Sequence, residues 1–149
     1  MSRRVMRGFR GERLRELREA RGISQQDLAR MADLSAGLVV GRWENGERTP
    51  QIDLLARVAE VLGEPIEHFV EISPDDRFLG DLRILRGLTQ PALAARLGIN
   101  TATLAELERG QRRLRPEIAQ RLADVLAFPV ETVVAAHEAV RSRPPGTPP

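Results

Sequence analysis

Arginine is the residue type in this chain best suited to bind another molecule. All 23 basic residues are Arg and none is Lys, and a guanidinium group can hold a phosphate or a guanine edge with two parallel hydrogen bonds. A base-composition bias of the coding genome is the simpler explanation for the use of Arg in place of Lys. The formal net charge of the chain is only +2. Any nucleic-acid contact must therefore come from local clusters of Arg, such as Arg109, Arg112, Arg113 and Arg115.

Residue types for metal or enzyme chemistry are sparse. The chain has no cysteine, and its two histidines, His68 and His137, have no cluster of ligands near them in sequence. No pair of titratable groups converges with a nucleophile in the pattern. We therefore expect no metal site, no cofactor and no enzymatic activity.

The elements that must position the Arg side chains occur twice. Residues 20–35 match residues 85–100 at an offset of 65, and Trp43 to Gly46 match Leu107 to Gly110 at an offset of 64. Self-similarity of this kind indicates two copies of one structural unit. One residue has been gained in the first copy, or lost from the second, between Ser35 and Glu44.

Each copy has the signals of five short helices. Residues 12–21 predict the first helix, Ser24 and Thr89 cap the second, and a third carries Val40 and Trp43 or Leu104 and Leu107. The fourth runs from about 52 to 62 and from about 116 to 126, and a short fifth follows Pro65 or Pro129. In the second copy, Ser73 to Asp76 read as an N-cap, a Pro and an acidic first turn, so we expect a helix to start there.

Composition agrees with helices throughout. Hydrophobic residues make up 42% of the chain and aromatic residues only 3%, so aliphatic side chains supply the cores. We predict an all-α fold with a basic arm at residues 1–8, one domain at 9–72, a second at 73–140, and a disordered Pro-rich tail at 141–149. The longest apolar runs are far too short to span a membrane, so we expect a cytoplasmic, nucleoid-associated protein.

The ordered pattern L-R-x-x-R-x-x-R-G-[IL]-[ST]-Q-x-x-L-A, followed by E-N-G or E-R-G and a closing A-x-x-L, resembles the phage-repressor/Cro-type (XRE) helix-turn-helix family. The resemblance extends from about Phe9 to Ala136. It implies two tandem five-helix bundles, each a lambda-repressor-like DNA-binding domain with a helix-turn-helix, and double-stranded DNA as the partner.

The resemblance also implies which residues contact DNA. The Gln that opens helix two contacts the DNA backbone, which corresponds to Gln25 and Gln90, with Gln26 beside the first. Residues at the start of helix three, and two and three places before its Glu, face base edges: these are Ser35, Ala36, Gly37, Leu38, Gly41 and Arg42 in the first copy, and Asn100, Thr101, Ala102, Ala105 and Glu106 in the second. Thr101 and Thr103 could equally cap helix three.

We expect the first copy to be the base reader, because Arg is the commonest specific reader of guanine and Arg42 lies on its third helix. Gly37 and Gly41 weaken that helix but permit close approach of its backbone to DNA. Glu106 in the second copy would repel phosphates unless it accepts a hydrogen bond from cytosine. The resemblance implies backbone-phosphate contacts from the cluster after helix three of the second copy, Arg109, Arg112, Arg113 and Arg115. Such contacts add affinity without sequence information. Arg48 is a further candidate for DNA contact in the first copy.

Other conspicuous residues have structural interpretations. The resemblance pairs Glu44 with Arg18, and Glu108 with Arg83, inside each domain. Trp43 is in phase with Val40 and is predicted to lie in the core. Ahead of the first helix, only Arg3, Arg4 and Arg7 are candidates for an arm that enters a minor groove, because Glu residues among the later Arg indicate a solvated face.

Two functions from different classes remain. The first is a sequence-specific DNA-binding regulator acting as a homodimer, since one small reading head touches too few bases for strong selection, although the tandem could itself supply both heads. The second is an antitoxin or adaptor in which one or both helix-turn-helix units have become a protein-binding or dimerisation module. The weak base-facing chemistry of the second copy and the extra residue in the first copy favour that alternative.

Overall fold

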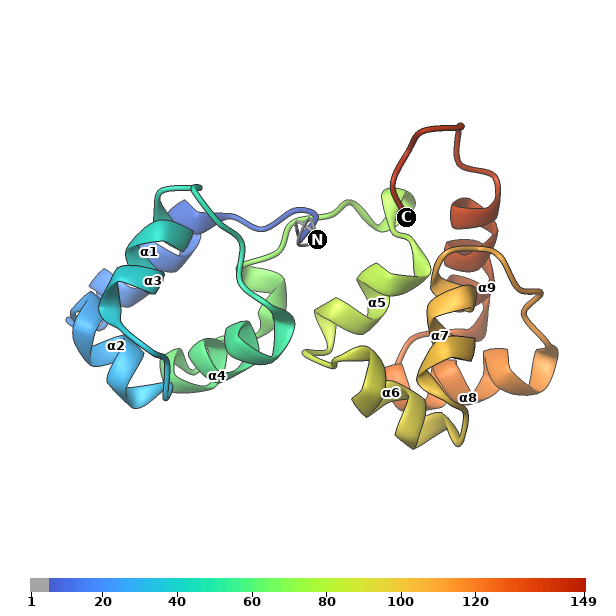
Figure 1. Ribbon diagram of the computed structural model, residues 1–149, viewed down its shortest axis with the longest axis horizontal. Helices are drawn as coiled ribbons and strands as arrows, with labels where there is room; N and C mark the ends of the chain where they lie inside the picture. Colours follow the sequence, from blue (N-terminus) through green and yellow to red (C-terminus); the bar gives the residue numbers. More distant parts are fainter. Residues whose placement is uncertain (1–5) are drawn as a thin grey trace. The chain divides into compact units, whose positions relative to one another are not determined.

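The fold is all-α, as predicted, and divides into two compact units, Met1–Ile72 and Ser73–Pro149. A computed structural model describes residues 6–149 of the chain (Figure 1). Among these residues the only extended pairing is an isolated bridge between Phe9 and Val70. The arm candidates Arg3 and Arg4 lie outside the described residues.

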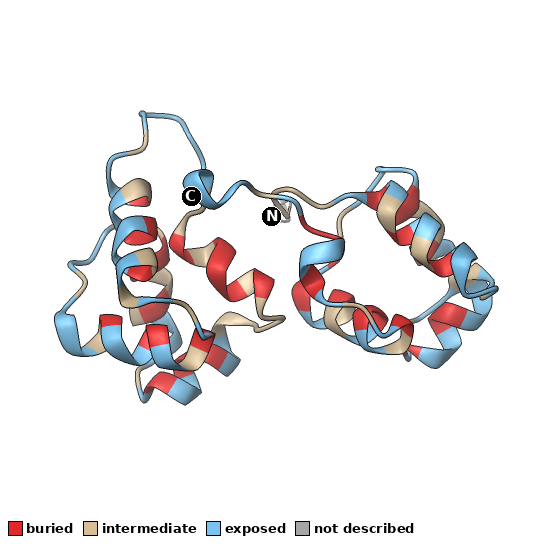
Figure 2. Ribbon diagram, turned by 180° about the vertical axis from the view of Figure 1, so that it is seen from behind, coloured by how far each residue is buried: buried red, intermediate tan, exposed pale blue. Residues whose placement is uncertain are grey.

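The described part of unit one, residues 6–72, has four α-helices and a final single turn. These are α1 (Gly11–Ala20), α2 (Gln25–Met31), α3 (Gly37–Glu44), α4 (Ile52–Leu62) and the 3-10 turn η1 (Ile66–His68). Leu14, Leu28, Val40, Leu55 and Phe69 are completely buried, and the buried positions form stripes on the inward faces of the helices (Figure 2). Trp43 belongs to this core, as predicted, because it is only 3% exposed.

Unit two repeats the arrangement with a longer final helix. It contains the turn η2 (Pro74–Asp76), α5 (Leu79–Leu85), α6 (Gln90–Leu97), α7 (Thr101–Glu108), α8 (Pro116–Leu126) and α9 (Val130–Arg141). Its core is aliphatic and includes Leu82, Leu93, Leu104, Leu122 and Val133.

The start of the first helix in unit two differs from the expectation. Residues 74–76 form only a 3-10 turn, and α5 begins at Leu79. The reason is a cap further along the chain, where the Asp81 carboxylate accepts a hydrogen bond of 2.7 Å from the backbone N–H of Phe78. An acidic side chain at this position satisfies a free donor of the first turn.

The last element also differs between the units. In unit one the chain is extended after η1, so that Val70 pairs with Phe9 and Glu71 N–H donates to Gly8 O. In unit two α9 spans 12 residues, because Val133, Ala136, His137 and Val140 recur at helical spacing and are all buried. Short helices in both copies were expected, and for unit two that expectation is wrong.

Residues near both ends of the described segment, residues 6–149, form hydrogen bonds with their own unit. Met6 N–H donates to Thr49 Oγ1 at 3.1 Å, so the part of the predicted arm that is described runs along unit one. At the other end Arg141 still belongs to α9, and Arg143 donates to the backbone carbonyls of Arg109 and Val140 at 2.9 and 2.6 Å. Ser142 also donates to the Glu138 carbonyl, so the Pro-rich segment predicted to be disordered begins with three residues that the helix and these hydrogen bonds hold in place.

The extra residue of the first copy lies in the turn before α3. Asp33 and Gly98 match at an offset of 65 and both have a left-handed backbone, with φ of 55° and 69°. The helices α3 and α7 then match at an offset of 64, with eight residues each and with Ala36 and Asn100 as their N-caps. The added residue is thus accommodated next to Ser35, outside both helices.

Candidate nucleic-acid interface

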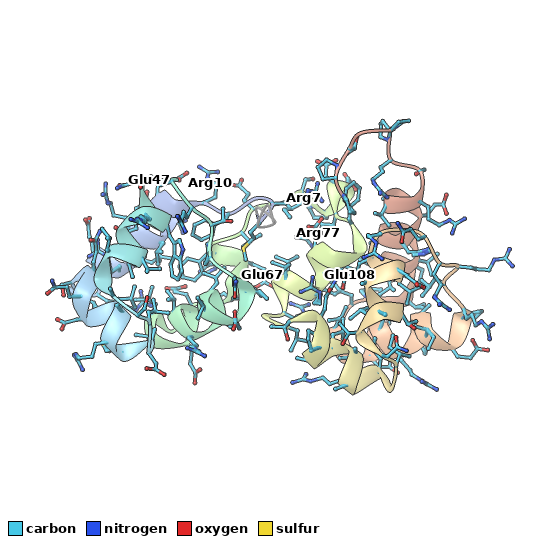
Figure 3. The ribbon with its side chains drawn as sticks, in the orientation of Figure 1. Arg7, Arg10, Glu47, Glu67, Arg77 and Glu108 are labelled. Atoms are coloured by element: carbon cyan, nitrogen blue, oxygen red, sulfur yellow. The ribbon has the colours of Figure 1, made fainter. Side chains whose placement is uncertain are left out.

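A buried ion pair joins the first and third helices of each unit. In unit one, Arg18 Nε and Nη2 donate to the Glu44 carboxylate at 2.6 and 3.1 Å. In unit two, Arg83 Nε and Nη2 donate to Glu108 at 2.8 and 2.9 Å, and Glu108 extends from α7 toward α5 (Figure 3). The side chains of both Glu residues are almost inaccessible to solvent. Both predicted ion pairs are therefore confirmed.

The Gln that opens the second helix joins the same network. Gln25 Nε2 donates to Glu44 at 2.8 Å, and Gln90 Nε2 donates to Glu108 at 3.0 Å. Each carboxylate therefore binds side chains from both the first and the second helix of its unit. The half-buried amides of Gln25 and Gln90 are held in this internal contact, and their expected contact with the DNA backbone stays a prediction.

Electrostatics favour the ionised form of Glu44. Burial alone would raise the pKa of this carboxyl, but hydrogen bonds from Arg18 and Gln25, with the charges of Arg18 and Arg15, outweigh burial and lower the pKa below its ordinary value. Arg15 Nε lies 3.6 Å from the carboxylate. At the matching position unit two has Gly80, where a Cβ would lie 3.1 Å from Glu108 Oε1.

The two glycines of α3 allow α2 to pack closely against it. A Cβ at Gly37 would lie 3.0 Å from Gln26 Cα, and a Cβ at Gly41 would lie 3.3 Å from Gln25 Oε1. The neighbour that excludes a side chain at these positions is thus α2 of the same unit. Close packing against α2 therefore explains why positions 37 and 41 are glycine. The predicted approach of the backbone to DNA would be a second reason.

The outer surface of unit one combines apolar and basic side chains. Leu38 is 66% exposed and Met31 is 48% exposed, although both are large and apolar. Arg42 is half-buried on α3, Ser35 and Ala36 are exposed in the preceding turn, and Arg48 is exposed in the loop that follows α3. In the sequence, Leu38 is a candidate for base contact only because of its position. It is the most exposed large hydrophobic residue in the described part of the chain, and an exposed apolar side chain suits contact with a thymine methyl group. The exposure of Met31 could not be inferred from the sequence.

The outer surface of unit two is partly neutralised by its own charges. Glu106 on α7 forms a salt bridge of 2.8 Å with Arg112, and Arg109 Nε donates to Gln111 Oε1 at 3.0 Å. The repulsive carboxylate expected at position 106 is therefore paired with one of the Arg residues expected to bind phosphate. The charges of Glu106 and Arg112 are present in the sequence, but only the fold of the loop after α7 brings them together.

The cap of α7 is made by Asn100. Its Oδ1 accepts a hydrogen bond of 2.7 Å from Thr103 N–H, whereas Ala36 at the matching position has no side chain that could cap α3. Because Asn100 is the cap, neither Thr101 nor Thr103 has that role. Thr101 is exposed, and Thr103 is half-buried at the edge of a cavity.

The described part of the chain shows neither a cluster of metal ligands nor a membrane-spanning helix. Residues 6–149 contain no group of three or more His, Asp or Glu side chains that could hold a metal ion. Nor does any helix among them have the length and apolar character that a membrane span needs.

Comparison with known proteins gives a consistent result. The helix-turn-helix family model matches residues 14–69 and again residues 79–133. Over 62 residues, 42% of the chain, the sequence is 44% identical to a putative HTH-type transcriptional regulatory protein of Pyrococcus furiosus. Over 74 residues, 49% of the chain, it is 36% identical to the uncharacterized HTH-type transcriptional regulator RghRB of Bacillus subtilis. The aligned segments span 19% and 53% of the lengths of these relatives. No solved structure matches significantly.

Proposed function

The chain belongs to the XRE-type helix-turn-helix family, and from this premise we propose that it is a sequence-specific DNA-binding transcriptional regulator that acts as a repressor. Its relatives carry the name of transcriptional regulators. In this proposal the protein acts by non-covalent binding and catalyses no reaction. It acts in the cytoplasm, at the nucleoid. Double-stranded DNA is the proposed partner.

The observation that carries the proposal is the frame formed by Glu44. The buried carboxylate connects α1, α2 and α3, so that the outer face of α3 is held on a rigid support. We infer that this face enters the major groove with Arg42 reading a guanine and Leu38 contacting a thymine methyl group. Arg48 then binds a backbone phosphate beside it.

Unit two has a different role in this proposal. Its α7 offers Ala105 and the paired Glu106 where unit one offers Gly41 and Arg42. We infer that unit two adds phosphate contacts through Arg109, Arg112 and Arg113, or dimer contacts, and that unit one selects the sequence. A homodimer would present two copies of α3 to a palindromic operator.

A second candidate function rests on the same salt bridge. A surface on which Glu106 neutralises Arg112 attracts DNA phosphates less strongly than free Arg side chains would, and contact with another protein depends less on such attraction. This favours an antitoxin or adaptor in which unit two binds a protein partner.

Selection of bound sequences from a random DNA pool tests these alternatives. An enriched palindrome supports the homodimer, and a direct repeat supports two heads within one chain. The Arg42→Ala variant, tested in parallel, should lose enrichment at one base pair of each half-site. Absence of any enrichment, together with tight binding to another protein, would replace the proposal by the adaptor function.

A further inference from the structure

We propose that unit two contains a binding site for a small organic anion with a flat apolar body, such as an aromatic carboxylate. The site is a cavity of about 310 Å³ between α7, the loop that follows it and the start of α8. Its apolar lining comes from Ile99, Leu107 and Ile118, and Thr103 contributes a hydroxyl group. The volume is at the lower end of the range typical of small-molecule sites.

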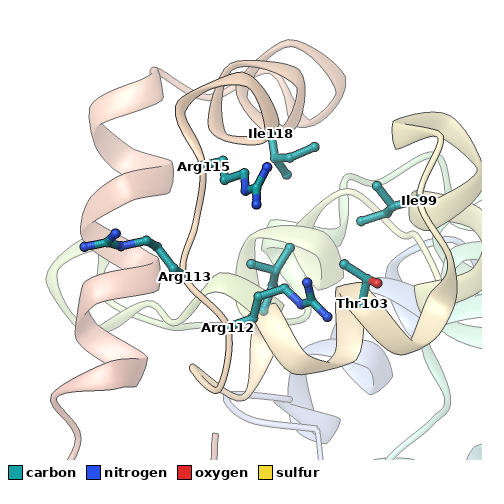
Figure 4. A pocket seen from close by; sticks show the side chains of 7 residues that line it. Ile99, Thr103, Arg112, Arg113, Arg115 and Ile118 are labelled. Carbon is teal, nitrogen blue, oxygen red and sulfur yellow. The ribbon is translucent and has the colours of Figure 1, made fainter.

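Two guanidinium groups give the cavity its preference for an anion. Arg112, Arg113 and Arg115 all border the cavity. The side chains of Arg112 and Arg115 extend over it, whereas the side chain of Arg113 points the other way (Figure 4). Guanidinium groups above an apolar surface can bind a carboxylate with paired, charge-assisted hydrogen bonds while the rest of the ligand leaves water.

The duplication provides an internal comparison. The positions in unit one that match Leu107 and Arg115 are occupied by Trp43 and Gln51. Trp43 is 3% exposed, so the larger indole is packed inside unit one where unit two has the smaller Leu107. The smaller Leu107 and the second cation, Arg115, are therefore specific to unit two, and an indole ring is a suitable shape for a probe.

The loop that carries the two Arg residues is held in place without a ligand. His137 of α9 is buried, and its Nε2 lies 2.9 Å from the backbone carbonyl oxygen of Arg112. Since the described part of unit one has no helix comparable to α9, this support is also specific to unit two. A preformed site loses less entropy on binding than a flexible one.

The cavity is coupled to the outer face of α7 through one side chain. Arg112 Nε forms the salt bridge of 2.8 Å with Glu106. A ligand carboxylate that recruits Arg112 leaves the charge of Glu106 unpaired on that face, which repels DNA phosphates. The ligand therefore acts as an inducer that weakens DNA binding, and DNA weakens ligand binding by the same factor. This coupling, unlike the site itself, rests on the proposed function.

The site is tested on the full chain without DNA. Indole-3-carboxylate, neutral indole, acetate and inorganic phosphate are titrated at matched ionic strength, and backbone amide chemical shifts are followed by NMR. We expect saturable binding of indole-3-carboxylate with shifts at Ile99, Thr103 and Ile118, at least about tenfold tighter than the binding of acetate or phosphate. Equal binding of all three anions would overturn the proposal, since it would show a general basic surface.

Three variants make the test specific. Arg115→Gln should weaken indole-3-carboxylate binding by about tenfold or more without affecting neutral indole, and Arg113→Gln, the matched control, should change it by less than about twofold because Arg113 points away from the cavity. Leu107→Trp should abolish binding, with the fold checked by thermal unfolding. Equal effects of the Arg115 and Arg113 variants, or undiminished binding in a folded Leu107→Trp variant, would refute the site.

A DNA-binding titration at saturating indole-3-carboxylate separates the site from the coupling. A severalfold weaker DNA affinity supports the inducer role. Unchanged DNA affinity would overturn the coupling but not the site. Failure to bind any DNA sequence, with ligand binding intact, would count against the proposed function alone.

Discussion

Gln25 and Glu44, the first residue of α2 and the last residue of α3, are joined by a hydrogen bond of 2.8 Å. Gln90 and Glu108 repeat the contact in unit two at 3.0 Å. The bond fixes the two helices of the helix-turn-helix relative to each other at the same carboxylate that binds α1. The stability of each unit and the position of its third helix therefore depend on one buried carboxylate.

Removal of that charge should destabilise each unit strongly. Glu108→Ala leaves Arg83 buried without its partner, and a broken buried pair costs about 3–5 kcal/mol. Thermal unfolding should show a large loss of stability in Glu108→Ala, and Glu44→Ala is the matched variant in unit one. Unchanged stability with abolished DNA binding would contradict the structural role of Glu108.

The lowered pKa of Glu44 predicts loss of stability in acid. Its pKa in the folded state lies below the ordinary value of a glutamate side chain, which is the value in the unfolded state. The stabilisation is therefore complete above that value and disappears as the pH falls through the lower folded-state pKa. Urea unfolding at a series of pH values from 7 downward should show this loss. Glu44→Gln is the control and should show a shallower dependence on pH, and parallel curves would argue against the assignment.

Gly37 and Gly41 should respond differently to replacement by Ala. At position 37 the new Cβ meets the backbone of Gln26, so we expect Gly37→Ala to cost about 1–3 kcal/mol. At position 41 it meets only the side-chain amide of Gln25, with Oε1 at 3.3 Å, and the better helix propensity of Ala, about 1 kcal/mol, offsets this milder contact. Chemical denaturation of the two variants compares them directly. Equal stabilities would show that α2 moves away easily.

Arg42 is predicted to carry base readout. Arg42→Ala should cost about 1–3 kcal/mol of binding to the preferred DNA and relax selection at one base pair. The measurement is the affinity for the selected site and for single-base variants of it. An equal loss for all DNA sequences would assign Arg42 to a phosphate contact instead.

The Arg cluster after α7 should contribute affinity without specificity. Replacing Arg109, Arg112 and Arg113 by Ala should weaken binding to all DNA similarly and reduce the salt slope by about 0.9 for each phosphate that is no longer neutralised. Preference for the operator should survive, with the oligomeric state checked alongside. A collapse of the ratio of specific to nonspecific affinity would show that unit two reads bases. Unchanged affinity and slope would mean that unit two does not touch DNA.

Local signals made much of the fold predictable. Ser24 and Thr89 cap their helices through Asp27 N–H and Ala92 N–H, because a hydroxyl group before a helix satisfies its free donors regardless of distant contacts. The Arg–Glu pairs were also identified, because the family pattern contains both partners.

Contacts between distant residues could not be read from the sequence. A Cβ at Gly11 would lie 2.2 Å from the Trp43 carbonyl oxygen, yet in the sequence this glycine only precedes a helix. The salt bridge between Glu106 and Arg112 depends on the path of a loop, and the cavity depends on packing around Leu107. Identical local patterns are compatible with different tertiary neighbours, and only the folded chain distinguishes them.

The longer turn beside Ser35 has a consequence for how such proteins diversify. An insertion inside α3 would rotate every later side chain by about 100°, since a helix has 3.6 residues per turn. In the turn, the added residue leaves α3 at eight residues, the same length as α7, and leaves Glu44 bonded to Arg18 and Gln25. A change of length at this point alters the turn that leads into α3 and spares the core. After a gene duplication, one copy can thus change the length of this turn in a single mutational step while it keeps the helix and its buried ion pair.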